Sequence, residues 1–484
     1  MSVLTTQLFL DIAYQGSLPV AEVTAVTNDS RRVQPGSVFV CTVGRSSDGH
    51  RFAAQALAAG AALVVSEHPL GLPAEVTVPN GRAAYAQLCS AFFDHPSRQL
   101  RLVAVTGTNG KTTVTTLIKQ ILEAGGHRCG LIGTIHSMVD TMELPAKYTT
   151  PEAWDLQMLL AKMAAAGCDC AVMEASSQAL DQLRLYGLRF ECGVFTNLTQ
   201  DHLDYHHTME AYFQAKASLF AHCDTVIFNR DDAWARRLPA MYPQKHCISF
   251  SASEDAADFT ARNVQLDPGG VRFAMVSRRA VQQIRFPMPG AFSVHNAMAA
   301  AIVGLQMGVV PDAVTRALQS SCGVRGRCEV LYHGAFTVIC DYAHTGDGIE
   351  KILGSLRPFA HGRLIALFGC AGERDAAKRP QMAQAALKYA DFIVLTSDNP
   401  RREDPQSILQ EVEPLLRAGQ KPYLVEIERR RAVYAALEQL RPGDVLVLCG
   451  KGHEDYQVLD GVTIYLDEHR IVHDWLKKRG MLPE

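Results

Sequence analysis

The feature that most restricts the fold is the segment RLVAVTGTNGKTTVTTLIKQILEAGG, residues 101–126. An apolar run from Leu102 to Val105 predicts a buried strand, and the spacing of apolar residues from Val114 onward predicts a helix that ends at Gly125. A strand, a glycine-rich turn and a helix in this order are typical of a phosphate-binding loop, because glycines let backbone N–H groups approach phosphate oxygens and the helix N-terminus favours anions. The segment therefore predicts a parallel α/β sheet that binds a nucleotide at the turn.

The loop differs from the common nucleotide-binding loop in its spacing. Two residues separate Gly107 from Gly110, where four are usual. Lys111 supplies a point charge for the phosphates, and Thr112 offers a hydroxyl to Mg²⁺. The predicted triphosphate-binding residues are Gly107, Thr108, Asn109, Gly110, Lys111, Thr112 and Thr113. The alternative is an ordinary glycine-rich turn.

Strand and helix patterns alternate along the rest of the chain. Apolar runs such as CAVME, CGVF and TVIFN lead into polar loops, and RLIALFGC, DFIVLTS and DVLVLC repeat the pattern towards the C-terminus. A chain of 484 residues exceeds what one core usually spans. We predict an α/β protein of three domains: a small α/β domain (1–97), a central P-loop NTPase-like parallel sheet (98–330) and a Rossmann-like domain (331–484).

Composition limits the partners of the chain. The formal net charge is −3 and 20% of residues are charged, so neither nucleic acid nor an anionic membrane is expected as a partner. The thirteen cysteines include no Cys-x-x-Cys pair, which favours reduced core thiols. The N-terminus lacks a basic flank, and no apolar stretch approaches the ~20 residues of a membrane span. We expect a cytoplasmic monomer that acts on small molecules and does not insert into membranes.

Candidate metal ligands follow two of the predicted strands. Glu174 ends the run CAVME, and His202 follows VFTNLTQ. Such groups suit a cation that neutralises charge during phosphoryl transfer. His202, His206 and His207 could instead form a zinc site, although DHLDYHH contains no cysteine ligand and a solvated loop is the commoner explanation.

Further motifs occur in order along nearly the whole chain. They are GTNGKTT, TTPE, MEASSQAL, TNLTQDHLDYH, AKASLF, DYAHTGDG, GERDAAKRP, DNPRREDP and GKGHEDYQ. Together they resemble the Mur ligase family. The resemblance implies an ATP- and Mg²⁺-dependent ligase of peptidoglycan biosynthesis whose domains close around one site. Such ligases convert a carboxylate to an acyl-phosphate, which an amine then attacks, so positioning and charge neutralisation carry the rate.

The resemblance also assigns the groups around ATP. Thr112 matches the ligand of one Mg²⁺, and Glu174 and His202 match ligands of a second. Lys216 matches a lysine that the family carbamylates to N6-carboxylysine, which turns a cation into a metal ligand; from the sequence alone it would be a surface charge on a helix. The implied catalytic residues are Lys111, Glu174, His202 and Lys216. The other implied ATP contacts are Asn296, Arg327, His344 and Asp347. Gly346 and Arg325 replace usual prolines in this region.

The acceptor substrate implied by the resemblance is a UDP-muramoyl-dipeptide. Arg184 has the chemistry to match a carboxylate. The implied contacts are Ser30, His50, Thr149, Thr150, Ser176, Gln182 and Arg184. Thr150 could instead cap a helix, and residues 29–31 could form a turn with solvated charges. Gln178 stands where many members carry histidine.

The incoming amino acid is implied by the DNPRREDP motif. In the family, an arginine after Asp-Asn-Pro marks ligases that add meso-diaminopimelate, whereas lysine-adding members differ there. A guanidinium can hold the additional carboxylate of diaminopimelate through two parallel hydrogen bonds. The implied contacts are Arg374, Asp398, Asn399, Arg401, Gly450 and Glu454. We expect Lys451 and His453 only to shape their loop, and Ala371 replaces a usual glycine.

The prediction is therefore an ATP-dependent ligase that adds meso-2,6-diaminopimelate to UDP-N-acetylmuramoyl-L-alanyl-D-glutamate. Two alternatives within the ligases are an L-lysine-adding member and a folylpolyglutamate synthetase, although the latter would lack the uridine-binding first domain and the DNPR loop. An alternative from another class is a binding protein that ATP hydrolysis switches. Only a ligase needs all the metal, acceptor and amine motifs together.

Overall fold

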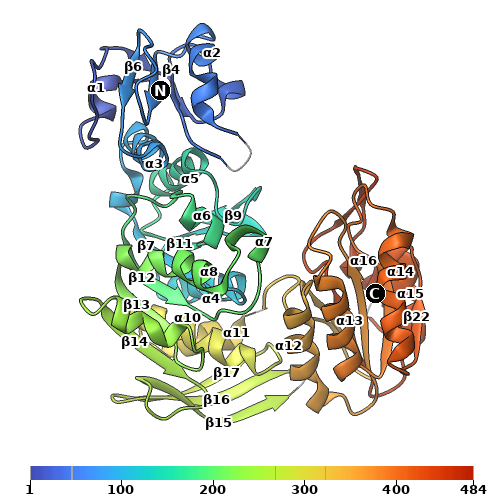
Figure 1. Cartoon of the computed structure of the whole chain (residues 1–484). Helices are drawn as coiled ribbons and strands as arrows, with labels where there is room; N and C mark the ends of the chain where they lie inside the picture. The colour runs from blue at the N-terminus through green and yellow to red at the C-terminus, as the bar shows by residue number, and fades with distance from the viewer. Residues whose placement is uncertain (1, 45–46, 268, 322, 483–484) are drawn as a thin grey trace.

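The computed structural model describes residues 2–44, 47–267, 269–321 and 323–482. Its main sheets have four, eleven and six strands. Figure 1 shows the N-terminal unit at one end of the central unit and the C-terminal unit beside the other end, with α12 (Gly346–Leu356) nearest to the central unit. This arrangement confirms the predicted class of three α/β units, while the boundaries after residues 97 and 330 stay predictions.

The N-terminal unit is a small parallel sheet. Its strands are, in spatial order, β3 (Ala25–Thr27), β4 (Ser37–Val40), β5 (Leu63–Ser66) and β6 (Glu75–Thr77). Helix α2 (Ala53–Ala58) packs against Phe39 and Val64, and α3 (Gly81–Phe92) packs against Val38 and Val65 on the other face. Successive strand residues therefore point to opposite faces of the sheet and pack in an apolar layer on each face.

The central sheet has a parallel core with antiparallel edges. The parallel strands, in spatial order, are β8 (Cys129–Ile132), β11 (Cys170–Glu174), β7 (Arg101–Thr106), β12 (Phe190–Phe195), β13 (Cys223–Asn229), β14 (His246–Ser251) and β15 (Phe259–Asp267). The hairpin β9–β10 (His136–Val139, Met142–Pro145) extends one edge, and β16–β17 (Gly270–Ser277, Val281–Phe286) extends the other. The parallel core was predicted, but the edges were not, because a hairpin needs no helix between its strands.

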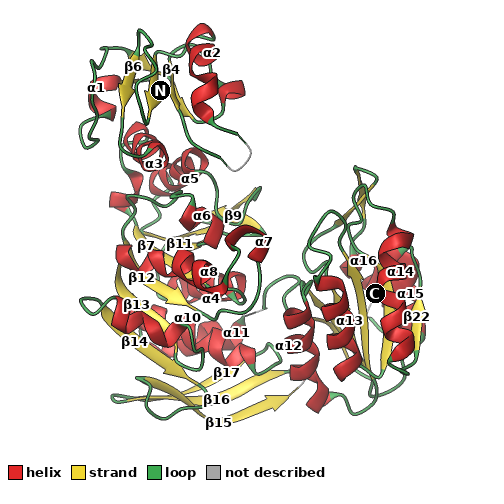
Figure 2. Ribbon diagram, viewed as in Figure 1, coloured by secondary structure: helices red, strands yellow, loops and turns green. Residues whose placement is uncertain are grey.

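Helices cover both faces of the central sheet (Figure 2). Buried residues of α4 (Lys111–Ala124), α10 (Phe292–Gln306) and α11 (Pro311–Ser320) belong to one core cluster. Those of α5 (Ala153–Ala165) and α8 (Met209–Ala217) belong to a second. Helix α4 begins and ends as predicted, since Gly110 precedes it with φ = 87° and Gly125 caps it.

The C-terminal sheet is also mostly parallel, in agreement with the Rossmann-like prediction. Its strands, in spatial order, are β18 (Glu329–His333, antiparallel), β19 (Thr337–Asp341), β23 (Val445–Cys449), β20 (Leu364–Cys370), β21 (Phe392–Ser397) and β22 (Tyr423–Val425). Helices α12, α13 (Lys378–Tyr389) and α14 (Pro405–Ala418) pack on one face, and α15 (Arg429–Glu438) and α16 (Glu468–Lys478) on the other. Residues under α12–α14 and under α10 form one cluster, so these two units share a core.

The remaining short strands and α-helices lie outside the three main sheets. They are β1 (Val3–Leu4), α1 (Thr5–Leu8), β2 (Glu22–Val23), α6 (Ser177–Asp181), α7 (Leu203–His206), α9 (Leu238–Met241), β24 (Tyr456–Leu459) and β25 (Val462–Tyr465). Within the described ranges the cysteines are free and nearly all buried, as predicted for core thiols. No helix of the described chain has both the length and the apolar content to span a membrane.

Candidate active site

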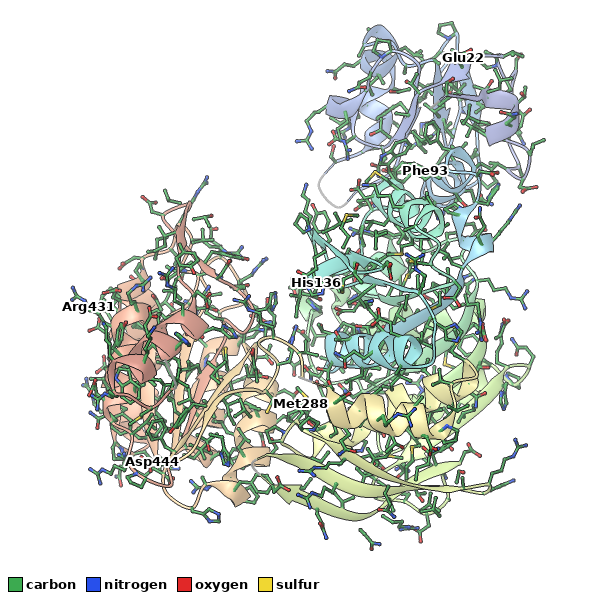
Figure 3. All side chains as sticks on the ribbon, turned by 180° about the vertical axis from the view of Figure 1, so that it is seen from behind. Glu22, Phe93, His136, Met288, Arg431 and Asp444 are labelled. Atoms are coloured by element: carbon green, nitrogen blue, oxygen red, sulfur yellow. The ribbon has the colours of Figure 1, made fainter. Side chains whose placement is uncertain are left out.

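A cavity of about 850 Å³ lies at the carboxyl ends of the central strands and extends to α12. Figure 3 labels Met288, one of its lining residues, at the junction between the central and C-terminal units. The predicted residues that line it are Thr108, Asn109, Gly110, Lys111, Thr112, Thr113, Thr149, Glu174, His202, Asn296, Arg327 and His344. One cavity therefore joins the phosphate loop and the candidate metal ligands of the central unit to groups of the C-terminal unit.

The phosphate loop requires its two glycines. Gly107 and Gly110 have φ values of 139° and 87°, which only glycine adopts readily. A Cβ atom on Gly107 would lie 2.0 Å from Thr196 Oγ1, and one on Gly110 would lie 2.6 Å from Asn296 Oδ1. Asn197 holds the turn, since its Oδ1 accepts from Asn109 N (3.1 Å) and its Nδ2 donates to Asn109 O (3.1 Å).

Lys111 folds back onto its own loop. Its Nζ donates to the carbonyl oxygens of Gly107 (2.9 Å) and Thr108 (2.8 Å). Burial lowers the pKa of Lys111, while Glu174 and Asp201 oppose that shift. Phosphate oxygens in the cavity would replace carbonyl acceptors with stronger, charged ones.

The candidate metal ligands supply oxygen and imidazole donors. Glu174 is 1% exposed and accepts from Thr134 N (2.8 Å) and Oγ1 (3.0 Å). His202 is half-exposed, and burial of its ring, opposed by Asp201 and helped by Lys111 and Lys216, lowers its pKa. An imidazole and a carboxylate that line the same cavity as Thr112 fit a divalent cation that prefers oxygen ligands.

Lys216 is buried rather than on the surface. It is 1% exposed, and its Nζ donates to Gly107 O (2.8 Å) behind the phosphate loop. Burial and the neighbouring Lys111 charge lower its pKa well below the usual value. As an unmodified lysine it brings a nitrogen donor to the loop and no oxygen ligand to the cavity. The lowered pKa increases the share of the neutral amine, which is the form that reacts with carbon dioxide.

The C-terminal unit contacts the phosphate loop directly. Asp347 accepts from Asn109 Nδ2 (3.1 Å) and Thr199 Oγ1 (2.9 Å), although it does not line the cavity. Lys378 Nζ lies 2.8 Å from Asp201 Oδ1 across the two units. Burial alone would raise the pKa of Asp201, but the charges of His202 and Lys378 outweigh it and hold this pKa at about 2.

Arg327 lies over the ring of Tyr342, with its guanidinium carbon 4.6 Å from the ring centroid. Its Nη2 is 3.4 Å from Thr112 Oγ1, at the start of α4. His344 is exposed, and its Nδ1 lies 2.8 Å from Tyr342 O. Gly346, which replaces a usual proline, is tightly packed, since an added Cβ would lie 2.8 Å from Gln381 Cβ.

The predicted acceptor contacts from the central unit converge beside Glu174. Thr150 Oγ1 donates to Glu174 O (2.7 Å) and accepts from Ser176 N (3.0 Å). Arg184 donates to Thr150 O (2.8 Å) and Gln182 Oε1 (2.7 Å) and pairs with Glu152 (2.7 Å). Thr149 Oγ1 accepts from Thr134 Oγ1 (3.1 Å). Gln178 is half-buried on α6.

Ser30 and His50 lie apart from these residues, in the N-terminal unit. Ser30 begins a short 3₁₀ turn whose first N–H groups are capped by Asp29. His50 is buried and fully engaged, since Nδ1 lies 2.6 Å from Asp48 Oδ1 and Nε2 accepts from Glu67 N (3.1 Å). Their roles towards a substrate stay predictions.

A second cavity of about 330 Å³ lies within the C-terminal unit. Its lining residues are Glu373, Asn399, Arg401, Arg402, Glu454, Tyr456, Val458 and Gly461. Arg401 has a left-handed backbone (φ = 61°), and its N–H donates to Val458 O (3.0 Å), which fixes the loop against β24. The predicted residues Asn399, Arg401 and Glu454 therefore meet at one site.

The other residues predicted to contact the amino acid lie outside the lining of this cavity. Asp398 is buried, and its Oδ1 lies 3.2 Å from Lys451 Nζ. Gly450 has φ = 112°, and its N–H donates to Asp341 O (3.0 Å). Arg374 is exposed and does not line this cavity, while Ala371 precedes the same loop.

Sequence reasoning missed Tyr342 and underrated Lys451. Tyr342 lines the first cavity, and its hydroxyl donates to Glu454 Oε1 in the second (3.4 Å). Lys451 is completely buried and donates to Asn399 Oδ1 (2.6 Å) and Glu454 Oε2 (3.0 Å). Both lie within two residues of the end of a buried strand, and that position was the signal in the sequence.

The zinc alternative finds no support in the described residues. His206 bonds Ser177 Oγ (2.9 Å), and the only potential cluster of three ligands found among those residues lies elsewhere, at His127, Asp169 and Cys170. There His127 Nδ1 and Asp169 Oδ2 lie 2.5 Å apart and satisfy each other without an ion.

Comparisons with known proteins agree with this geometry. Family models match residues 22–92 (Mur ligase family, catalytic domain), 105–304 (Mur ligase middle domain) and 326–452 (Mur ligase, glutamate ligase domain). A UDP-N-acetylmuramoyl-L-alanyl-D-glutamate–2,6-diaminopimelate ligase of Gloeobacter violaceus is 44% identical over 96% of each chain. The Geobacillus thermodenitrificans protein of that name is 40% identical over 95% of this chain and 96% of its own.

Solved structures of Mur ligases and of a related synthase share the fold of this chain. A structure of a UDP-N-acetylmuramoyl-L-alanyl-D-glutamate–2,6-diaminopimelate ligase superimposes with a TM-score of 0.73 at 33% identity, covering 99% of this chain and 100% of the other. A Mycobacterium tuberculosis folylpolyglutamate synthase shares the fold at 19% identity, with a TM-score of 0.61 over 75% of this chain and 91% of its own. This chain belongs to the Mur ligase family.

Proposed function

We propose that the chain is an ATP-dependent ligase that joins meso-2,6-diaminopimelate to UDP-N-acetylmuramoyl-L-alanyl-D-glutamate. The observation that carries the proposal is the meeting of two cavities at Tyr342, one lined by the phosphate loop and the other by Arg401 and Glu454. The names of relatives at 38–44% identity support the same activity.

The first cavity would activate the acceptor. Lys111 leaves its loop carbonyls to hold the terminal phosphate, while Arg327, stacked on Tyr342, faces the same region with an unpaired Nε. The acceptor carboxylate attacks this phosphorus, so an acyl-phosphate forms and ADP leaves. Both cations lie where negative charge develops, and such preorganised charge lowers the barrier.

Mg²⁺ would supply charge neutralisation for the phosphates when bound. We assign Thr112 to one ion and Glu174 and His202 to another. Lys216 would contribute once its neutral amine has added carbon dioxide and lost a proton, because the carbamate then presents oxygen atoms instead of an ammonium.

The second cavity would select the amine. Arg401 would bind the carboxylate of the non-reacting end of diaminopimelate, and Glu454 its ammonium, while L-lysine lacks the carboxylate that Arg401 requires. The amine of the other end attacks the acyl-phosphate and phosphate leaves. We further propose that the enzyme works as a monomer in the cytoplasm.

The test is phosphate release by the purified protein with ATP, Mg²⁺ and each substrate alone or together. A ligase releases phosphate chiefly when both UDP-muramoyl-dipeptide and meso-diaminopimelate are present, and mass spectrometry then detects the tripeptide product. Equal use of L-lysine would favour the lysine-adding alternative. ATP turnover without any amine would favour a nucleotide-switched binding protein, and turnover of folate substrates would favour a folylpolyglutamate synthetase.

A further inference from the structure

A completely buried ion pair lies beneath the second cavity. Arg429 begins α15 and Glu468 begins α16, both side chains are 0% exposed, and Arg429 Nε donates to Glu468 Oε1 (2.8 Å). Removing a guanidinium from water is costly unless its other N–H groups also find acceptors. The position of those acceptors therefore indicates what the buried charge does.

The remaining N–H groups of Arg429 bind the ends of two strands. Nη2 donates to Cys449 O (2.8 Å), at the end of β23, and Nη1 donates to Ser397 O (3.3 Å), at the end of β21. Strand β20 lies between these strands, so no ladder hydrogen bonds join them. Arg429 thus links two strand ends that the sheet itself does not connect.

The two loops of the second cavity begin at the next residues. Asp398 follows Ser397 and leads to Asn399 and Arg401, while Gly450 follows Cys449 and leads to Glu454. Gly450 lies against this guanidinium, since a Cβ added to it would be in ordinary contact with Arg429 Nη1 and Nη2, at 3.8 Å. The spacing of the loops is therefore fixed directly below them.

The buried ion pair is one part of a group of charges below the two loops. Arg429 and Lys451 provide two buried positive charges, against three carboxylates on Glu468, Asp398 and Glu454. Of these carboxylates only Glu454 is among the lining residues of the cavity. Among these five groups one negative charge remains in excess, and Glu454 presents it where an ammonium would bind, while Arg401 lines the same cavity with a positive charge.

We propose that Arg429 is a positioning residue for the amino-acid site: it sets the separation of the Asn399–Arg401 loop and the 450–454 loop, and so the match between the cavity and a substrate zwitterion. Arg429 does not touch the substrate. The identity of that substrate rests on the proposed function, whereas the positioning role rests on the contacts above.

The test compares Arg429→Lys with Arg363→Lys. Lysine keeps the charge but cannot bond two carbonyls and Glu468 at once. Arg363 is a matched control because it pairs with the buried Asp444 (2.6 Å), beside the opposite ends of β20 and β23. Figure 3 labels Asp444 near the lower end of the C-terminal unit.

We expect Arg429→Lys to raise the KM for meso-diaminopimelate at least about tenfold, with the KM for ATP within about twofold of the parent. Arg363→Lys should lower thermal stability and leave both KM values unchanged. Amide hydrogen exchange at Asp398, Asn399 and Arg401 and at residues 450–454 should quicken in Arg429→Lys and not in Arg363→Lys. Glu468→Gln, which keeps an acceptor for Arg429, should give the same changes in weaker form.

An unchanged amino-acid KM with unchanged exchange in a folded Arg429→Lys protein would overturn the positioning role, as would equal effects of Arg363→Lys. If Arg429→Lys does not fold, Glu468→Gln decides by the same two measurements. A parent enzyme that ignores meso-diaminopimelate contradicts the proposed function instead, because the exchange comparison needs no substrate.

Discussion

The two cavities are built in different ways. The nucleotide cavity takes its walls from two units, and its main cation, Lys111, is bonded to carbonyls of its own loop. The amino-acid cavity lies within one unit, and its lining carboxylate Glu454 is already paired with the buried Lys451, which also pairs with Asp398. The first cavity must rearrange when a ligand enters, whereas the second is preorganised.

We infer from this difference that the first cavity acts in catalysis and the second in the selection of the amine. A cation that changes partners can follow charge as it moves to the transition state, so substitutions in the first cavity should act on turnover. A rigid set of paired charges discriminates between ligands, so substitutions in the second cavity should act on the choice of amine. The predictions below test this division in order of expected effect.

Lys111→Ala should cause the largest loss. We expect kcat/KM for phosphate release to fall by about 10³-fold, because the loop loses the cation that would hold the terminal phosphate. Binding of meso-diaminopimelate, measured by calorimetry, should change less than about twofold. A comparable loss of amino-acid binding would show that the two cavities are not independent.

Arg401→Ala should weaken the selection between meso-diaminopimelate and L-lysine rather than the chemical step. Loss of two charge-assisted hydrogen bonds predicts a fall of about 10²-fold in the kcat/KM ratio of meso-diaminopimelate to L-lysine. Competition between the two amino acids measures this ratio directly, with the KM for ATP as the internal reference. Arg417→Ala is the control, because Arg417 is an exposed arginine on α14 that pairs with Glu413. Unchanged discrimination in Arg401→Ala would refute the assigned role.

Lys378→Ala should have a moderate effect on the cavity shared by two units. It breaks the pair with Asp201 that joins those units, and we expect kcat/KM to fall by about three- to tenfold, since one partly exposed pair contributes about 1 kcal/mol. Arg189→Ala breaks an exposed pair with Asp224 inside the central unit, outside the lining of the cavity, and should leave the rates unchanged. Equal rates for both variants would mean that the cross-unit pair does not assist assembly of the site.

Local features of the site could be predicted from the sequence. The φ values of Gly107 and Gly110 follow from a turn that only glycine allows. Glu174 ends one buried strand and His202 lies in the loop after another, so their position at the sheet edge was foreseeable. These properties depend on a few neighbouring residues.

Long-range contacts could not be predicted in this way. Lys216 and Arg429 both lie at helical positions that look like surface charges, and nothing in their local pattern indicates the carbonyl groups that bury them. The pair between Asp201 and Lys378 joins two units, which a local pattern cannot reveal. The antiparallel edges of the central sheet were missed because hairpins lack the strand–helix alternation.

The smallest expected effect concerns stability at the junction of α16 and β18. His469 Nε2 lies 2.7 Å from Glu329 Oε2, and Glu329 also accepts from Gly326 N (2.6 Å), beside Arg327. Burial disfavours charged His469, but the bond to Glu329 outweighs it and raises the pKa of His469 above 6.5. Burial likewise opposes charge on Glu329, yet the bond to His469 holds the pKa of Glu329 below 4.5.

These directions fix the sign of the pH dependence. The raised pKa of His469 stabilises the fold fully below pH 6.5, and this contribution is lost as the pH rises through its folded value. The contribution of Glu329 is present above pH 4.5 and is lost at lower pH.

His469→Gln should therefore lower the free energy of unfolding by about 1 kcal/mol near pH 5.5 and by less near pH 8.5. Urea unfolding at both pH values measures the difference in the free energy of unfolding. His473 is an exposed histidine on the same helix, and His473→Gln should show no such pH-dependent difference. A loss that does not depend on pH would mean that His469 acts through packing and not through its charge.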